Sequence, residues 1–125
     1  MPDEIRILLA IPVYDHPGTL RAVVAGALAV HDQVLVIDDG SSEAAAGLIA
    51  GLAATVVRHP ENLGKGEAIR TAARWAAERG FTHLVTMDAD GQHDPAQFPA
   101  FRSRMEASPE AVIIGVRDFG SPTVP

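Results

Sequence analysis

Short apolar runs rich in valine and isoleucine alternate along this sequence with longer stretches rich in alanine and leucine. The apolar runs are bounded by polar or turn residues, as expected of strands buried on both faces: Ile5–Ile11, Val34–Ile37, Thr55–Val57, Leu84–Met87 and Val112–Val116. The longer stretches have helical composition: 19–30, 42–53, 65–79 and 95–107. This alternation predicts an α/β fold, an open, mostly parallel sheet with helices on both faces.

Several of the predicted helices carry start or stop signals. Ser41 or Ser42 can cap the helix predicted over 42–53, and Asp94 followed by a proline can begin the helix predicted over 95–107. Gly80 follows the third helix as a stop signal. With 125 residues, the chain predicts a single domain over 1–118 and a loop-like tail over 119–125.

Charge and cysteine content exclude several classes of function. Ten basic residues against sixteen acidic ones give a net charge of −6, which argues against a nucleic-acid partner. Cysteine is absent, which excludes disulfides and thiolate metal sites and fits a reducing, cytoplasmic setting. The longest weakly polar stretch, Ala44–Val57, is shorter than the ~20 residues that a membrane span needs.

Ligands of open α/β sheets bind at the carboxyl ends of the strands, so the residues that follow each strand are the candidate site. The segment 12–18 follows the first strand and lacks the G-x-G-x-x-G of dinucleotide-binding folds; the chain also lacks a P-loop. Tyr14 in this segment could present its ring to a flat ligand or be a half-buried turn residue.

The second and third strands are followed by acidic and glycine-rich segments. Of Asp38 and Asp39, one carboxylate could cap the next helix or bind backbone amides, while the other accepts a hydrogen bond from a base or a ribose. Gly64, Lys65 and Gly66 open the third helix, where free amides and the helix dipole favour an anion.

The fourth strand is followed by a D-x-D motif, the most informative feature of the sequence. Asp88 and Asp90 can converge on one hard cation, and Gln92 and His93 could complete its shell. Haloacid-dehalogenase-type phosphatases carry such a motif after their first strand, and an EF-hand needs further spaced ligands and a closing glutamate. Neither pattern fits here, and Asp94 is interpreted as a helix cap.

Together these motifs resemble family-2 glycosyltransferases of the GT-A fold. The resemblance is carried by four segments in order: 11–14 (Ile-Pro-Val-Tyr), 36–42 (Val-Ile-Asp-Asp-Gly-Ser-Ser), 62–66 (Asn-Leu-Gly-Lys-Gly) and 87–93 (Met-Asp-Ala-Asp-Gly-Gln-His). The last segment, with Ile-Gly-Val-Arg at 114–117, is most similar to the polyprenyl-phosphate (dolichyl-phosphate) sugar transferases.

The resemblance implies a donor site for the nucleotide. Pro12 and Tyr14 would border the nucleoside, Asp39 would accept a hydrogen bond from the base, and Asp38 would support that loop. Gly64 and Lys65, with neighbouring Gly66, would lie near the nucleotide, and Arg70 would reach it.

The resemblance also implies a metal and a phosphate contact. Asp88 would lie near the ribose and a divalent cation (Mg or Mn), Asp90 would hold that cation, and Gln92 matches a further metal-side position. Arg117 would approach a phosphate group. The implied reaction is metal-assisted sugar transfer from a nucleoside-diphosphate sugar to a lipid phosphate, with a peripheral location at the inner face of the membrane.

Family members continue well past the fifth strand, so the resemblance implies truncation after that strand, at the acceptor side. We therefore expect these 125 residues by themselves to bind donor but not to transfer sugar efficiently. The alternative to a glycosyltransferase is a non-catalytic nucleotide-sugar-binding module or fragment. The exposed edge of a sheet that ends near Val116 also favours a homo-oligomer. A sugar-1-phosphate nucleotidyltransferase is a weaker alternative, because its glycine-rich segment after the first strand is missing.

Overall fold

A computed structural model of the 125-residue chain describes residues 5–90, 99, 102–103 and 113–116, the last four by their backbone only. Within these described residues, five strands and three bounded helices follow one another: β1 (Ile7–Val13), α1 (Leu20–Val30), β2 (Val34–Asp38), α2 (Ala45–Leu48), β3 (Thr55–Arg58), α3 (Lys65–Glu78), β4 (His83–Met87) and β5 (Ile113–Val116). The predicted α/β fold is confirmed.

The five strands form one sheet in the order β3-β2-β1-β4-β5, and every neighbouring pair is parallel. Strand β1 is central, with Leu9 opposite Val34 of β2 and Ile7 opposite His83 of β4. The chain order runs outward to one side through β2 and β3 and then to the other side through β4 and β5. The order therefore reverses between β1 and β4, and crevices form at the carboxyl ends of strands at such points.

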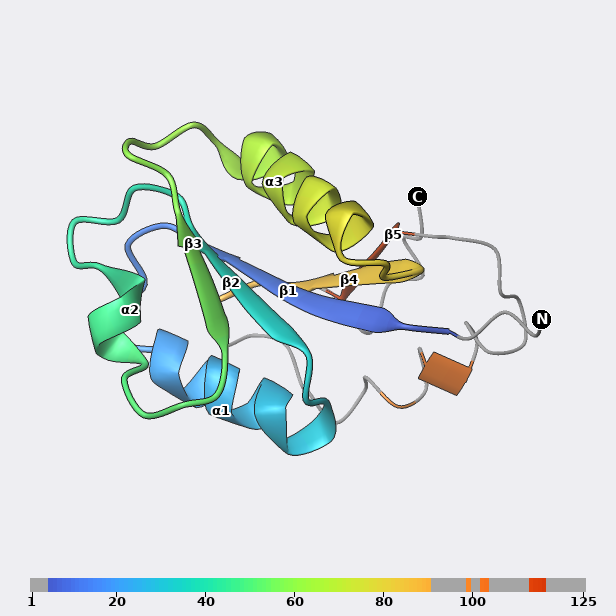
Figure 1. The fold of residues 1–125 in the computed structure, drawn as a ribbon. Helices are drawn as coiled ribbons and strands as arrows, with labels where there is room; N and C mark the ends of the chain where they lie inside the picture. Colours follow the sequence, from blue (N-terminus) through green and yellow to red (C-terminus); the bar gives the residue numbers. More distant parts are fainter. Residues whose placement is uncertain (1–4, 91–98, 100–101, 104–112, 117–125) are drawn as a thin grey trace.

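Helices cover both faces of the sheet, as predicted. Figure 1 shows α3 on one face and α1 with α2 on the other. Odd-numbered residues of β1 pack against α1 and α2, and even-numbered ones pack against α3, because successive strand side chains point to opposite faces. The α3 side of the core uses three small residues, Ala68, Ala72 and Ala76, which let the helix approach the sheet closely.

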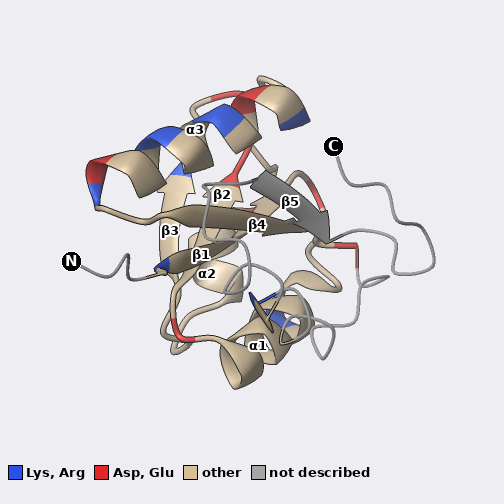
Figure 2. Ribbon diagram, turned by 90° about the vertical axis from the view of Figure 1, so that its right-hand side faces the viewer, with Lys and Arg blue, Asp and Glu red and all other residues tan. Residues whose placement is uncertain are grey.

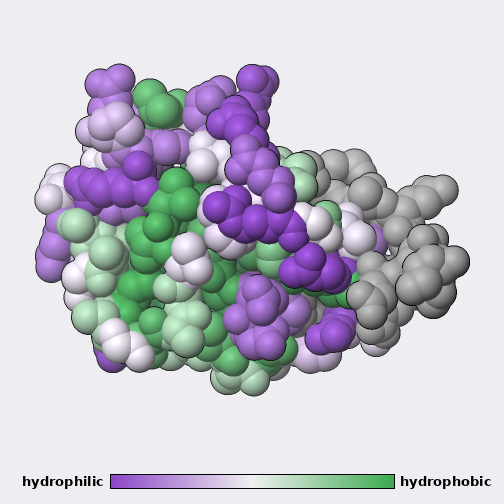
Figure 3. Space-filling model, viewed as in Figure 1, coloured by the Kyte–Doolittle hydropathy of each residue, from purple (hydrophilic) through white to green (hydrophobic). Residues whose placement is uncertain are grey.

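The outer surfaces of the two faces differ. In Figure 2, lysine and arginine alternate with acidic residues along α3. Figure 3 shows hydrophilic side chains over α3 and more hydrophobic surface around β3. Strand β3 forms one edge of the sheet, with Thr55 and Arg58 exposed.

Among the helices within the described residues, none is long and apolar enough to cross a membrane.

Two local predictions are wrong. The helix expected over 42–53 is limited to Ala45–Leu48. It does not continue to residue 53 because Gly51 adopts φ 89° and because Arg21 Nη1 donates hydrogen bonds to the carbonyls of Leu48 and Ala50. The cap expected from Ser41 or Ser42 is absent; a carboxylate oxygen of Asp38 accepts from the Ala45 amide instead.

The remaining boundaries are closer to expectation. The first strand begins and ends two residues later than predicted, so Pro12 and Val13 belong to β1. Gly80 does end α3: at φ 78° its amide donates to Ala77, and the next amide donates to Ala76. Of the helix expected over 95–107, the described residues 99, 102 and 103 are helical. Asp94, the rest of that helix and the tail lie outside the described residues.

Candidate functional site

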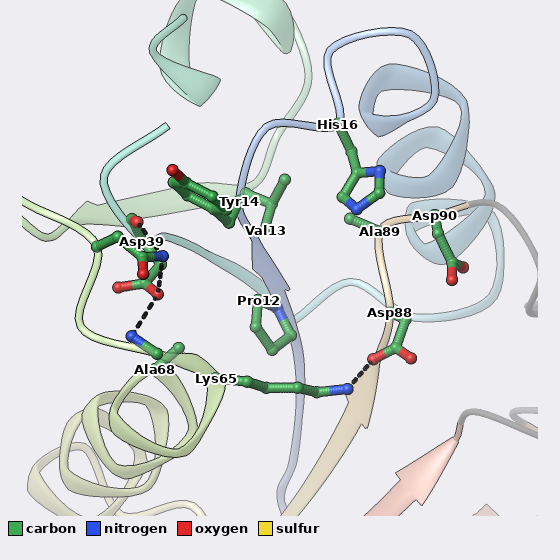
Figure 4. Close-up of a pocket in the computed structure, with 12 residues that line it drawn as sticks. Pro12, Val13, Tyr14, His16, Asp39, Lys65, Ala68, Asp88, Ala89 and Asp90 are labelled. Atoms are coloured by element: carbon green, nitrogen blue, oxygen red, sulfur yellow. Dashed lines mark hydrogen bonds and ion pairs between the residues drawn. The ribbon is translucent and has the colours of Figure 1, made fainter. Parts of the chain in front are cut away.

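A cleft of about 430 Å³ opens at the carboxyl ends of the strands, at the point where the strand order reverses. It is lined by residues 12–14 and 16 from the end of β1, Asp39 after β2, the segment around the start of α3, and residues 88–90 after β4. Figure 4 shows these side chains converging from four segments that are far apart in the sequence. Seven residues singled out from the sequence line this cleft: Pro12, Tyr14, Asp39, Gly64, Lys65, Asp88 and Asp90.

Of the other four candidates, two lie away from the cleft lining and two fall outside the described residues. Asp38 is fully buried and does not line the cleft. The Arg70 side chain is 75% exposed on α3 and pairs with Glu67 at 3.6 Å, so it does not line the cleft. Gln92, with His93, and Arg117 lie outside the described residues. The ligand contacts expected of these residues stay predictions.

Asp38 organises the loop after β2. Its Oδ1 accepts from the Ser41 amide at 2.9 Å, and its Oδ2 accepts from the Ala45 amide and from Arg58 Nη1, both at 2.8 Å. Burial alone would raise the pKa of the Asp38 carboxyl, but these amides and the Arg58 charge hold the pKa below its usual value. Asp38 therefore acts as a structural support of the loop.

The Asp39 carboxylate accepts four hydrogen bonds from within the chain. His59 Nδ1 (2.7 Å) and the Leu63 amide (2.9 Å) donate to Oδ1, while Asn62 Nδ2 (3.0 Å) and the Gly64 amide (2.9 Å) donate to Oδ2. A carboxylate has about four acceptor positions. A hydrogen bond from a base, as expected from the sequence, would be added to a group whose acceptor positions are already used.

The environment of Asp39 also fixes its ionisation. Only 3% of the residue is exposed, and this burial would raise the pKa of the carboxyl. The His59 ring and the amides of Leu63 and Gly64 outweigh that effect and lower the pKa of Asp39. The ionised carboxylate therefore holds the loop that leads into α3 against the end of β2.

His59 is a residue of the site that the sequence did not single out. It is buried, and because Asp39 only accepts, Nδ1 carries the proton of that bond. Its Nε2 lies 2.8 Å from Thr71 Oγ1 on α3. His59 therefore connects the Asp39 carboxylate to α3. A histidine two residues after a predicted strand was the available signal, but the residues that His59 contacts are distant from it in the sequence.

Close approach of two loops explains why glycine follows Asp39. A Cβ atom on Gly40 would lie 2.4 Å from the Glu61 carbonyl carbon, and the residue adopts φ 76°. The loop after β3 therefore packs directly on the loop after β2. This packing places the start of α3 beside the cleft.

The loop after β1 is also fixed by polar contacts. The Asp15 carboxylate accepts from the Ser42 amide at 2.6 Å, and the Asp15 amide donates to Ser41 Oγ at 2.9 Å. Asp15 adopts φ 54°, a conformation that aspartate tolerates better than most residues. Beside it, Tyr14 is 48% exposed at the cleft, so its ring is accessible to a ligand.

The D-x-D motif lies at the end of β4 on the opposite wall. Thr19 Oγ1 donates to the carbonyl of Ala89 at 2.5 Å, which holds the residue between the two aspartates in place. Asp88 Oδ1 pairs with Lys65 Nζ at 2.5 Å (Figure 4). Both Asp88 and Asp90 line the cleft.

The donor set of the motif suits a hard divalent cation. Within residues 5–90 and the short segments described beyond them, no three histidine, aspartate or glutamate side chains are grouped as a metal site. Mg²⁺, however, is commonly held by one or two carboxylates, with water and substrate phosphates completing the shell. Two carboxylates at one end of a cleft fit that pattern.

Comparison with known proteins agrees with this geometry. Residues 9–124 match the glycosyl transferase family 2. The chain belongs to this family. The GT-A-like α/β fold is the one expected of a member.

Curated relatives of the chain include transferases that act on lipid phosphates. The polyprenol monophosphomannose synthase of Mycolicibacterium smegmatis is 31% identical over 116 residues, which cover 86% of this chain and 44% of that protein. The undecaprenyl-phosphate mannosyltransferase of Micrococcus luteus is 35% identical over 106 residues, which cover 75% of this chain and 42% of that protein. The chain thus spans less than half the length of these relatives.

A third relative carries a different sugar in its name. The UDP-N-acetylglucosamine–dolichyl-phosphate N-acetylglucosaminyltransferase of Methanococcus voltae is 31% identical over 114 residues, covering 76% of this chain and 45% of that protein. All three names combine a polyprenyl-type lipid, phosphate and a sugar, and the sugar is mannose in two of them and N-acetylglucosamine in the third. The similarity therefore does not select a sugar for this chain.

Proposed function

We propose that this chain forms the donor-binding part of a glycosyltransferase that transfers a sugar from a nucleoside-diphosphate sugar to a polyprenyl phosphate. The single observation that carries the proposal is the cleft between the ends of β1 and β4, with the D-x-D carboxylates on one wall and the start of α3 on another. Membership of family 2 and the names of the relatives support the same reaction.

In this proposal the nucleoside lies near Pro12 and Tyr14, since the exposed Tyr14 ring offers a flat apolar surface at the cleft. The ordered loop held by Asp39 supports that end of the site. The diphosphate lies between the start of α3 and the D-x-D motif, where the helix N-terminus favours negative charge.

Asp88 and Asp90 would hold a divalent cation, Mg²⁺ or Mn²⁺, at the diphosphate, with Gln92 as a further ligand. When bound, such a cation supplies charge stabilisation for the leaving diphosphate. A phosphate acceptor already carries an anionic oxygen, so the chain does not have to supply a strong general base. A phosphate acceptor in a lipid also agrees with a peripheral location at a membrane.

Calorimetry with UDP-, GDP- and dTDP-sugars, with and without a chelator, tests the cation and donor assignments. We expect Asp90→Asn to lose about tenfold or more of the cation-dependent affinity, because removal of one carboxylate weakens the cation site. Asp32→Asn is the matched control, since Asp32 is exposed just before β2, at the opposite end of the strands. Equal affinities in chelator and in Mg²⁺ would contradict the role of the motif.

Transfer itself requires a separate assay with polyprenyl phosphate as acceptor. The full polypeptide should release nucleoside diphosphate only when both donor and acceptor are present. Donor binding without any transfer would instead support the alternative of a non-catalytic binding module. Light scattering would test the expected homo-oligomer.

A further inference from the structure

Lys65 and Asp88 form an ion pair inside the cleft. Lys65 is the first residue of α3 and Asp88 is the first residue after β4, so the pair joins two walls of the site. The Lys65 side chain extends past Pro12 to reach Asp88, as Figure 4 shows. Nζ and Oδ1 are 2.5 Å apart, and the side chains are 43% and 19% exposed.

The charges of the residues lining the cleft do not suit an anionic ligand. Among the lining residues that the structure describes, Asp39, Asp88 and Asp90 accompany one basic residue, Lys65, which gives these side chains a formal charge of −2 when His16 is counted as neutral. These described side chains would together repel a diphosphate. One divalent cation at the D-x-D motif would bring the formal charge to zero.

The other basic residues of α3 do not correct this imbalance. Arg70 and Arg74 are exposed and do not line the cleft, and Figure 2 shows the positions of lysine and arginine distributed along the helix. Lys65 is thus the basic side chain that α3 contributes to the described site. A lysine suits a change of partner, because its charge is compact and its stem is flexible.

We propose that Lys65 and a divalent cation exchange places at Asp88. Before the cation binds, the Lys65 ammonium offsets the Asp88 charge and limits repulsion from Asp90. When the cation binds the two carboxylates, its charge repels the ammonium at the same oxygen and Nζ leaves Asp88. Lys65 then turns to the anionic diphosphate of the ligand. Cation binding would therefore prepare the cleft for the nucleotide in two ways, by neutralising the carboxylates and by releasing a cationic side chain.

The proposal rests on the cation and nucleotide assigned under the proposed function, but its first step can be tested with the cation alone. Lys65 is the only lysine in the sequence. Isotope-labelled lysine therefore gives a single side-chain signal by NMR. We expect the chemical shift of that signal to change as MgCl₂ is added, until the change reaches a plateau. NaCl of equal ionic strength should not reproduce this change.

Cation affinity provides the second measurement. Electron paramagnetic resonance measures the concentration of free Mn²⁺, and hence the affinity of the protein for Mn²⁺, without any nucleotide present. Lys65→Met should bind Mn²⁺ about threefold to tenfold more tightly than the unaltered chain, because a competing charge is removed. Arg74→Met removes one positive charge from the exposed face of the same helix and should change the affinity by less than about twofold. With Mg²⁺ present, Lys65→Met should bind UDP and GDP more weakly than Arg74→Met.

The outcomes separate this proposal from the proposed function. A Lys65 signal that stays in place while Mn²⁺ binds, or a Lys65→Met variant that binds Mn²⁺ no more tightly than Arg74→Met, overturns the exchange. Failure of all three proteins to bind Mn²⁺ overturns it as well. If the exchange is observed but no nucleoside diphosphate binds, the exchange stands and the donor assignment fails.

Discussion

The Asp39 carboxylate offers the sharpest test of how the site is held together. Asp39→Asn keeps the size of the side chain but replaces one acceptor oxygen by an amide that donates. If the amide lies at the Oδ2 position, it faces the Gly64 amide; if it lies at the Oδ1 position, it faces the Leu63 amide. Neither backbone amide can reverse its polarity, so one donor loses its acceptor in either orientation.

The expected cost follows from these contacts. A buried donor left without a partner costs about 1–3 kcal/mol, and the remaining bonds weaken because the acceptor is no longer charged. We therefore expect the free energy of unfolding to fall by about 2–4 kcal/mol. The domain should remain folded, since domains of this kind are stable by ~5–15 kcal/mol.

Urea unfolding followed by circular dichroism measures this loss, with Asp32→Asn as the control of equal charge change on an exposed site. The midpoint should fall for Asp39→Asn and stay within error for Asp32→Asn. An Asp39→Asn variant with an unchanged midpoint and a large loss of nucleotide affinity would refute the reasoning. It would show that the carboxylate serves the ligand, as the sequence alone suggested.

Three further predictions concern the same region. Because the folded-state pKa values of Asp38 and Asp39 are lowered, their contribution to stability is present above the unfolded pKa of about 3.9 and is lost as the pH falls through the folded pKa values. Urea unfolding between about pH 5 and about pH 2.5 should show this loss, with a smaller change in the Asp39→Asn variant. Gly40→Ala should lower the free energy of unfolding by more than about 2 kcal/mol, because the new Cβ meets the Glu61 backbone at 2.4 Å; an unchanged melting temperature would contradict the close approach. Arg70→Met should leave nucleotide affinity unchanged by calorimetry, since Arg70 lies outside the cleft; a clear loss would restore the role expected from the sequence.

The sheet was predictable because its strands are short, apolar and separated by helical stretches. The site was expected at the carboxyl ends of the strands, where ligands of parallel sheets bind. Asp88 and Asp90 were singled out because they directly follow a strand that is easy to recognise. The extent of α2 was not predictable, because it depends on Arg21, which binds the carbonyls of Leu48 and Ala50 from another helix.

The partners of Asp39 were hidden for a related reason. His59 and Leu63 are 20 and 24 residues away in sequence, and only the parallel pairing of β2 with β3 brings the loops together. Two adjacent aspartates could be assigned a structural and a ligand-binding role from sequence, but their surroundings could not be derived. The structure gives both carboxylates structural contacts within the chain.

The central place of β1 has a consequence for how the chain is made. Its partner β2 is complete by residue 38, whereas its other partner β4 ends only at residue 87. During synthesis, one edge of the strand therefore has no pairing partner until residue 87 has emerged, and an unpaired apolar edge is prone to associate with other chains. Pairing over such a sequence distance also slows folding. Slow emergence of β4 from the ribosome would thus prolong a period in which nascent chains can aggregate, long before the cleft exists.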